Sequence, residues 1–272
     1  MPTATNGDVT IHYESFGTTG QPVLLLINGL GSQCINYAAE WCEKFAAEGY
    51  QVVRFDNRDV GLSSKLDGQS YVLKDMAQDA VAVLDAVGAR RAHVLGCSMG
   101  GMIAQRLAID SRDRLLSMTS VMSRTGEPGY GDSKPEALAF LTGKPAESRE
   151  QYIDHQVAAL RVYGSKPEWI EEDFIRARAA AAFDRCFCPA GVARQMMAVV
   201  ADGSRSQALN ALDLPVLVMH GSRDTLIDPS GGRQTAEAIP GSRYVEIEGM
   251  GHDYPRALWD RWVATWAGFA RG

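Results

Sequence analysis

The sequence is poor in clustered positive charge. Its formal net charge is −6, and no run of basic residues is longer than the Arg90-Arg91 pair. Proteins that bind nucleic acid need a basic patch to neutralise the phosphates. We therefore expect no nucleic-acid partner.

Long apolar runs are also missing. A helix needs roughly 20 apolar residues to cross a bilayer, whereas the most apolar run extends only from Val23 to Ile27. Residues 1–8 are polar and have neither the basic nor the apolar region of a secretory signal. These absences predict a cytoplasmic protein with no membrane partner.

Cysteine is scarce and unevenly spaced. There are five cysteines, an odd number, and the only close pair is Cys186 and Cys188. This spacing fits neither a disulfide framework nor a zinc site, so we expect reduced thiols and no metal. Cys97 lies inside a motif described below, where we interpret it as a buried strand residue and not as a reactive thiol.

The chain is long enough to bury one large core, since it has 272 residues of which 46% are hydrophobic. Apolar and β-branched runs alternate with helical patterns, which is typical of strand-helix-strand units and a mostly parallel sheet. Strands are expected at about 9–13, 23–27, 51–55, 92–97, 115–121, 215–220 and 243–247. Helices are expected at about 36–48, 75–87 and 255–269, the second one ending at Gly88.

Residues 123–212 interrupt this alternation, because they contain turn-rich linkers and helical patterns but no convincing strand. The helical patterns cover roughly 148–163, 168–186 and 190–201. Since a structureless loop of this length is rare in a compact domain, we expect a helical cap over one edge of the sheet. The predicted organisation is a core of residues 1–122 and 213–272 with a cap of residues 123–212.

The predicted cap carries apolar side chains suited to lining a small-molecule pocket. We expect two or three of them to face a substrate and the others to form the core of the cap. They are Phe140, Tyr163, Trp169, Phe183, Phe187, Met196 and Met197.

The segment Gly96-Cys97-Ser98-Met99-Gly100 follows a predicted apolar strand and precedes a helical pattern. A serine on such a strand-to-helix turn has a strained backbone, and the two glycines let the strand and the helix approach closely. The turn exposes the hydroxyl group. Ser98 is therefore the candidate nucleophile.

A nucleophilic serine needs a histidine base that is oriented by a carboxylate. Asp224 and His252 follow Ser98 in that order along the chain, and each comes just after a predicted strand. Open α/β sheets place their sites at the carboxyl ends of strands. We therefore expect Ser98, Asp224 and His252 to meet there as a catalytic triad.

Other residues compete for these roles. Asp228 lies in the same loop as Asp224 and is an alternative orienting carboxylate, because only geometry decides between them. We expect Asp253, which is adjacent to His252, to be a surface or loop-bonding residue. The remaining histidines are each expected to be structural, namely His12, His93, His155 and His220.

Attack on a carbonyl creates a negatively charged oxygen that needs two backbone N–H donors, one from the residue after the nucleophile and one from a loop after an earlier strand. Met99 is expected to supply the first. The turn Asn28-Gly29-Leu30-Gly31 directly follows a predicted strand, and Leu30 is the expected second donor. The alternative is that this segment is only a tight turn.

Together these motifs resemble those of the α/β-hydrolase superfamily, from the first strand to the last helix. The segment Arg54-Phe55-Asp56-Asn57-Arg58-Asp59-Val60-Gly61-Leu62-Ser63, with residues 96–101, is similar to bacterial carboxylesterases of the aclacinomycin methylesterase type. The resemblance implies a mostly parallel eight-stranded sheet flanked by helices, with a helical cap inserted after the sixth strand. Asp56, Arg58 and Asp59 are expected to form a structural charge network beneath the site.

The chain departs from this resemblance at Asn28, where many relatives have a histidine before the oxyanion-loop glycine. Because the expected donor is a backbone N–H, we predict an effect on loop geometry more than on chemistry.

The resemblance implies hydrolysis of small to medium apolar esters through an acyl-enzyme, with a small-molecule ester as partner and no cofactor. The same triad can pass the acyl group to peroxide or to another alcohol, or open a lactone, so a perhydrolase, an acyltransferase and a lactonase remain alternatives. A non-catalytic ligand-binding protein on this fold is a further alternative. The sequence leaves open whether the chain forms a homo-oligomer.

Overall fold

The computed structural model describes residues 1 to 272. Eight strands form one sheet in the order β1-β2-β4-β3-β5-β6-β7-β8. The pairs β1–β2 and β2–β4 are antiparallel and the other neighbouring pairs are parallel, which confirms the predicted fold class. The strands are β1 (Thr3–Asn6), β2 (Val9–Phe16), β3 (Val23–Ile27), β4 (Gln51–Phe55), β5 (Ala92–Cys97), β6 (Leu115–Val121), β7 (Val216–Gly221) and β8 (Arg243–Ile247).

The central strands are buried on both faces, which explains their nearly continuous apolar sequence. In β3, Val23, Leu25 and Ile27 belong to one hydrophobic cluster, while Leu24 and Leu26 belong to another. Successive side chains of a strand point to opposite faces of the sheet. The sheet is therefore the middle layer between two layers of helices.

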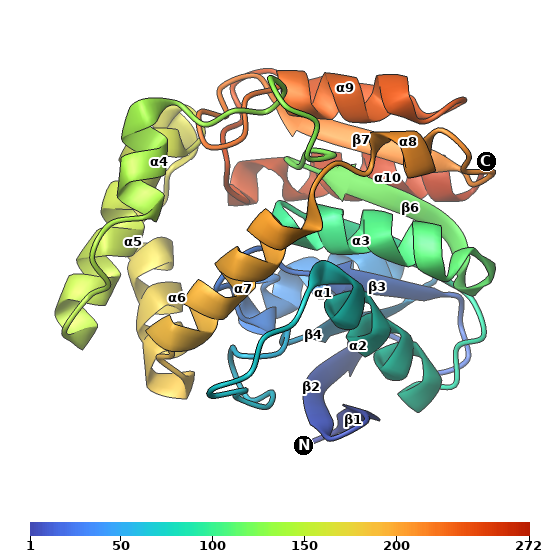
Figure 1. Ribbon diagram of the computed structural model, residues 1–272, viewed down its shortest axis with the longest axis horizontal. Helices are drawn as coiled ribbons and strands as arrows, with labels where there is room; N and C mark the ends of the chain where they lie inside the picture. Colours follow the sequence, from blue (N-terminus) through green and yellow to red (C-terminus); the bar gives the residue numbers. More distant parts are fainter.

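Helices cover both faces of the sheet (Figure 1). One layer contains α2 (Leu73–Ala86), α3 (Met99–Asp110) and α9 (Ser230–Ala238), and the other contains α1 (Ala39–Ala47) and α10 (Trp259–Ala270). The second layer is rich in aromatic side chains. There Trp41 stacks on Trp259 with ring centroids 5.4 Å apart and meets the edge of Trp262 at 5.2 Å.

Between β6 and β7 the chain forms helices and no strand, as expected for a cap inserted after the sixth strand. In Figure 1 the helices α4 to α7 lie together on one side of the sheet, at the left. The helix predicted at 168–186 begins later, at Glu172, because a separate 3-10 turn occupies Pro167–Trp169. The helices are α4 (Pro135–Leu141), α5 (Arg149–Tyr163), α6 (Glu172–Arg185), α7 (Pro189–Asp202) and α8 (Ser206–Leu209).

Four elements were not predicted from the sequence, namely β1, α4, α8 and α9. The first three have four to seven residues each, too few to show a period. Helix α9 begins with Ser230-Gly231-Gly232, and glycine disfavours a helix. A Cβ on Gly232 would lie only 2.4 Å from Nδ1 of His220, so the packing of α9 against β7 requires glycine at this position. The same glycine weakens the helical pattern in the sequence, which is why α9 was not predicted. None of the helices has the length and apolar composition needed to span a membrane.

Candidate active site

Ser98 lies at the junction of β5 and α3, between Cys97, which ends the strand, and Met99, which begins the helix. Its backbone has φ 57° and ψ −123°. Residues other than glycine rarely adopt a positive φ, and such strain is concentrated at functional sites. The turn places Ser98 at the carboxyl end of β5.

Two glycines allow the close packing around this turn. A Cβ on Gly96 would lie 2.0 Å from the carbonyl oxygen of Gly100, and a Cβ on Gly100 would lie 2.1 Å from the carbonyl oxygen of Ile27. Both contacts are with backbone atoms, which cannot move aside as a flexible side chain would. Helix α3 can therefore approach β3 and β5 only because both positions are glycine.

His252 and Asp224 meet Ser98 at this edge of the sheet. Nε2 of His252 lies 2.9 Å from Oγ of Ser98, and Nδ1 of His252 lies 2.7 Å from Oδ2 of Asp224. The three residues come after β5, β7 and β8, and the carboxyl ends of these parallel strands share one edge. The sheet thus brings together side chains that are far apart in the sequence.

The Asp224 carboxylate is held by more than His252. Its Oδ1 accepts the backbone N–H groups of Leu226 and Ile227, each at 2.9 Å, and Nε2 of His220 lies 3.3 Å from its Oδ2. Burial raises the pKa of Asp224, but the charge of His252 and the hydrogen bonds from both histidines outweigh burial and hold this pKa below 3.8. The carboxylate is therefore ionised at neutral pH.

The competing candidates have other partners. Oδ1 of Asp228 accepts the N–H of Ser230 at 3.0 Å, at the start of α9, and Asp228 does not bond to His252. None of the other histidines contacts Ser98. Their partners are Glu14 for His12 (3.4 Å), Ser117 for His93 (2.8 Å), Phe140 for His155 (4.3 Å between ring centroids) and both Ile227 (2.8 Å) and Asp224 (3.3 Å) for His220.

The turn after β3 lies against Ser98. A Cβ on Gly29 would lie 3.1 Å from Cβ of Ser98 and 3.3 Å from the carbonyl oxygen of Cys97. Leu30 is the next residue along this turn. Met99 is the first residue of α3, a position whose N–H has no partner within the helix. The N–H groups of Leu30 and Met99 are therefore candidate donors to a charged oxygen near Ser98.

Residues 22–254 match the family described as the alpha/beta hydrolase fold. This chain belongs to the α/β-hydrolase family. It is 32% identical to the rhodomycin D methylesterase DnrP of Streptomyces peucetius, over 95% of this chain and 94% of that protein. The predicted resemblance to bacterial methylesterases is thus confirmed, and the chain is an enzyme of the hydrolase class.

Solved structures of other hydrolases share the fold. Est816, described as an N-acyl homoserine lactone degrading enzyme, is 27% identical with a TM-score of 0.78, over 98% of this chain and 100% of that one. The enol-lactonase of Burkholderia xenovorans LB400 has a TM-score of 0.80 over the full length of both chains. At 23% identity, this second likeness is one of fold alone.

Gln195 in α7 bonds to the turn that follows β3, a role that the sequence does not indicate. It is fully buried, its Oε1 accepts the N–H of Gly31 at 2.9 Å, and its Nε2 donates to the carbonyl of Arg58 at 2.8 Å. A cap helix thereby fixes the residue that follows Leu30. No local pattern distinguishes this glutamine from other polar residues of an amphipathic helix.

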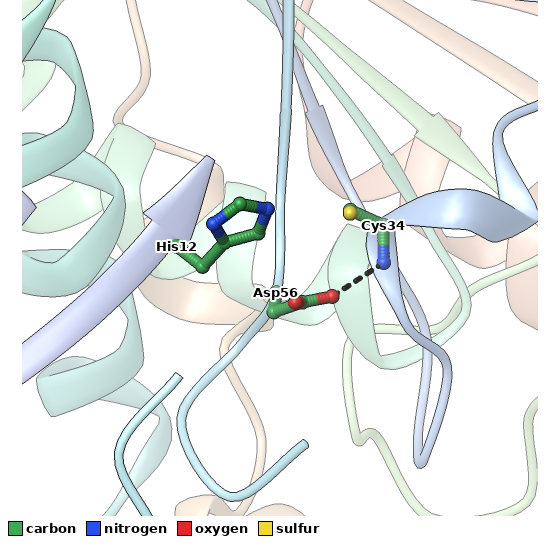
Figure 2. Close-up of side chains that lie close together, drawn as sticks. All are labelled: His12, Cys34 and Asp56. Atoms are coloured by element: carbon green, nitrogen blue, oxygen red, sulfur yellow. Dashed lines mark hydrogen bonds between the residues drawn. The ribbon is translucent and has the colours of Figure 1, made fainter. Parts of the chain in front are cut away.

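A buried polar cluster lies near the turn that follows β3. Figure 2 shows His12, Cys34 and Asp56, whose ligand-type atoms all lie within 4.8 Å of one another. Oδ1 of Asp56 accepts the N–H of Cys34 at 2.7 Å, while Oδ2 accepts the N–H of Leu62 at 2.9 Å and pairs with Arg185 at 2.7 Å. Because donors occupy both oxygens and Arg185 brings a positive charge, the cluster is an ion-pair network and is ill suited to a cation.

Two ion pairs of the predicted charge network join the cap to the core. Arg185 at the end of α6 pairs with Asp56, and Arg194 in α7 donates two hydrogen bonds to Asp59 at 2.7 and 2.8 Å. Arg58 pairs instead within the core, with a carboxylate of α2 at 2.6 Å. These contacts agree with the structural role predicted for all three residues of the network.

The cap side chains predicted to line a pocket differ in their relation to the site. The ring of Tyr163 lies 6.1 Å from that of His252 and perpendicular to it, and burial raises the pKa of Tyr163 to about 12, so its hydroxyl stays protonated. Phe187 stacks on Phe183 at 4.7 Å and is partly exposed. Met197 is 65% exposed and faces solvent. Of these four, only Tyr163 contacts a residue of the site.

The cysteines are free thiols. Cys97, directly before Ser98, is fully buried, and burial raises its pKa to about 12. Such a thiol stays protonated and inert at neutral pH. Its interpretation as a buried strand residue is confirmed.

Proposed function

We propose that this hydrolase is a serine carboxylic-ester hydrolase that acts on small to medium apolar esters through an acyl-enzyme. The observation that carries the proposal is the pair of contacts made by His252, at 2.9 Å to Ser98 and 2.7 Å to Asp224. A serine hydroxyl becomes a nucleophile at neutral pH when such a base is bonded to it. The similarity to a methylesterase supports an ester as the substrate.

The proton moves through His252. Nδ1–H donates to Asp224, which leaves Nε2 free to take the proton of Ser98 as Oγ attacks the ester carbonyl carbon. The tetrahedral intermediate then collapses, the ester C–O bond breaks, and the alcohol leaves with the proton from Nε2. Water attacks the acyl-enzyme by the same route in reverse and releases the acid with Ser98 restored.

The N–H groups of Leu30 and Met99 stabilise the negative oxygen of both tetrahedral intermediates. Preset backbone donors of this kind are worth more in the transition state than in the ground state, because the charge develops only there. Ionised Asp224 stabilises the imidazolium that forms at the same moment. No organic cofactor or metal takes part in these steps.

The work is divided between two parts of the chain. Residues 1–122 and 213–272 form the catalytic core and supply every reacting group. Residues 123–212 form the cap and supply walls of the substrate pocket. Substrate preference therefore depends on the cap, and the chemistry depends on the core.

The test uses p-nitrophenyl esters of increasing chain length and a fluorophosphonate label. The wild type and Ser148→Ala, which alters an exposed serine of the cap, should hydrolyse the esters and take the label. Ser98→Ala should lose activity by about a thousandfold or more and stay unlabelled. Ester turnover retained by Ser98→Ala would contradict the proposal.

A lactone is the second candidate substrate, because Est816 is described as degrading N-acyl homoserine lactones and matches 98% of this chain at 27% identity. The same attack by Ser98 would open the ring, with the alcohol remaining attached to the acid. Comparing kcat/KM for γ-lactones with kcat/KM for open-chain esters of equal carbon number distinguishes a lactonase from an esterase that prefers open-chain esters. Repeating the assay with hydrogen peroxide reveals perhydrolysis.

A further inference from the structure

The segment 162–166, which comprises the last two residues of α5 and the three residues before the 3-10 turn, lies against the loop that carries His252. The carbonyl of Tyr163 accepts the N–H of His252 at 2.7 Å, and the N–H of Lys166 donates to the carbonyl of Gly249 at 2.9 Å. The main chain of the cap is thus bonded directly to the main chain of the proposed base.

Ser165 is at the centre of this contact and is only 2% exposed. Its Oγ accepts the N–H of Gly251 at 2.9 Å and donates to Oδ1 of Asp253 at 2.5 Å, and its N–H donates to the same oxygen at 3.0 Å. One cap side chain therefore bonds to the residue before His252 and to the residue after it. Asp253 has the loop-bonding role that the sequence suggested, although it is buried and not at the surface.

The two segments are in backbone contact as well. A Cβ on Gly251 would lie 2.2 Å from the carbonyl carbon of Gly164 and 2.5 Å from the carbonyl oxygen of Tyr163. Since these are main-chain atoms, any side chain at Gly251 would push the cap away from the loop. Glycine at this position lets Ser165 reach both sides of His252.

The loop of the proposed acid is tied to the same segment. Oγ1 of Thr225, the residue after Asp224, donates to the carbonyl of Val162 at 3.0 Å. In the 2.7 Å contact between His252 and Asp224, the first residue therefore donates its own N–H to a cap carbonyl, and the second is followed by a residue that does the same with its hydroxyl. A shift of segment 162–166 would move both loops.

We propose that Ser165 is a positioning residue that sets the place of the His252 imidazole through Gly251 and Asp253. The inference rests on the proposed function, because it concerns the base of that reaction. Nε2 must remain within hydrogen-bond distance of Ser98, and a displacement of about 1 Å in such a group costs about a hundredfold in rate. Fixing the backbone on both sides of His252 restricts the movement of its Cα, from which the ring extends.

The experiment compares four variants of the full chain by kcat, by KM and by the rate of labelling with a fluorophosphonate. Ser165→Ala removes the Oγ bonds, Asp253→Ala removes the acceptor, and Asp253→Asn keeps an acceptor oxygen without the charge. Ser148→Ala is the control, because Ser148 is exposed, caps the start of α5 by accepting the N–H of Gln151 at 3.2 Å, and has no hydrogen bond to the loop that carries His252. Thermal unfolding of each variant reports its stability separately.

Ser165→Ala and Asp253→Ala should lower kcat and the labelling rate by about 10- to 100-fold with KM within about twofold of the wild type. Asp253→Asn should retain most of the activity, and Ser148→Ala should lose stability alone. A kcat for Ser165→Ala equal to that of Ser148→Ala, or a change confined to KM, would overturn the proposal. If Ser165→Ala does not fold, equal kcat values for Asp253→Ala and Asp253→Asn would overturn it.

These outcomes are separate from failure of the proposed function. A wild type that neither hydrolyses esters nor takes the label would refute the esterase assignment. A fully active wild type with fully active Ser165→Ala and Asp253→Ala variants would leave the esterase in place and refute only the positioning role.

Discussion

The orientation of His252 depends on a single carboxylate. Asp224 and Asp228 lie four positions apart in one loop, yet only Asp224 reaches Nδ1 of His252. Asp228 is used at the start of α9 instead. The sequence favoured Asp224 and left Asp228 as an alternative, and the contact with Nδ1 of His252 supports the first of them.

Replacing Asp224 tests this assignment. In Asp224→Asn the amide can donate to Nδ1, which favours the tautomer with the proton on Nε2 and removes the base. We expect kcat to fall by about a thousandfold to ten-thousandfold. The matched variant Asp228→Asn should keep kcat within about twofold. Similar losses in the two variants would contradict the assignment.

His93 is a residue whose effect is on stability and not on catalysis. Burial lowers its pKa below 6.5. As the pH falls below 6.5, the unfolded chain therefore takes up a proton that folded His93 refuses, and the folded state loses stability. The stabilisation is complete above this pH and is lost as the pH falls through the lowered pKa.

His93→Asn should remove this dependence. Urea unfolding between about pH 7.5 and about pH 5 should show a smaller decline for the variant, by at most about 1.4 kcal/mol per pH unit. His155→Asn serves as a comparison at a second histidine whose pKa is also lowered by burial. Parallel curves for the wild type and His93→Asn would contradict the account.

Helix α7 supports the turn that follows β3. Gln195 bonds to the N–H of Gly31, directly after Leu30, and a Cβ on Gly31 would lie 3.1 Å from a methyl carbon of Val192. The proposed oxyanion donor Leu30 is thus fixed from the cap side. Asn28 also helps to hold this turn, because its carbonyl accepts a hydrogen bond from the side chain of Asn57 at 3.0 Å.

Gln195→Met keeps the length of the side chain but removes both hydrogen bonds. The N–H of Gly31 is then left without its acceptor, and Leu30 is free to move relative to Ser98. We expect kcat to fall by about tenfold or more with little change in KM, because the oxyanion forms only in the transition state. Met197→Ala, an exposed change in the same helix, is the control. An unchanged kcat would show that α7 does not support the donor.

Some elements were predictable from the sequence because they have clear local signals. The strands at 23–27 and 51–55 lie at their predicted bounds as short runs buried on both faces, and the cap helix α5 begins one residue later than predicted, after its N-cap Ser148. Ser98 was predictable because the turn demands glycine at fixed positions around it. Gln195 and Ser165 were not, since their partners are distant backbone groups that leave no local pattern.

Ion pairs connect the cap to the core. Arg185 pairs with Asp56, which is fully buried, and also donates to Gln33 at 2.8 Å. Truncating one partner of a buried pair leaves the other charge without compensation. This connection therefore contributes to the stability of the molecule and not only to its shape.

Arg185→Met should lower the free energy of unfolding by about 3 kcal/mol, measured by urea denaturation. Asp56→Asn in the same chain should restore part of this loss, because it removes the uncompensated charge. Arg149→Met breaks an exposed pair with Asp184 between α5 and α6 and should cost less. Equal losses in Arg185→Met and Arg149→Met would contradict the role of the buried pair.

The proposed mechanism requires Ser98 to become acylated during turnover. Mass spectrometry of the enzyme, acid-quenched while it hydrolyses p-nitrophenyl acetate, detects this acylation. We predict the mass of one acetyl group on the peptide that contains Ser98, and no adduct in Ser98→Ala. Sustained hydrolysis by the wild type with an unmodified Ser98 peptide, and equal hydrolysis by Ser98→Ala, would contradict the account.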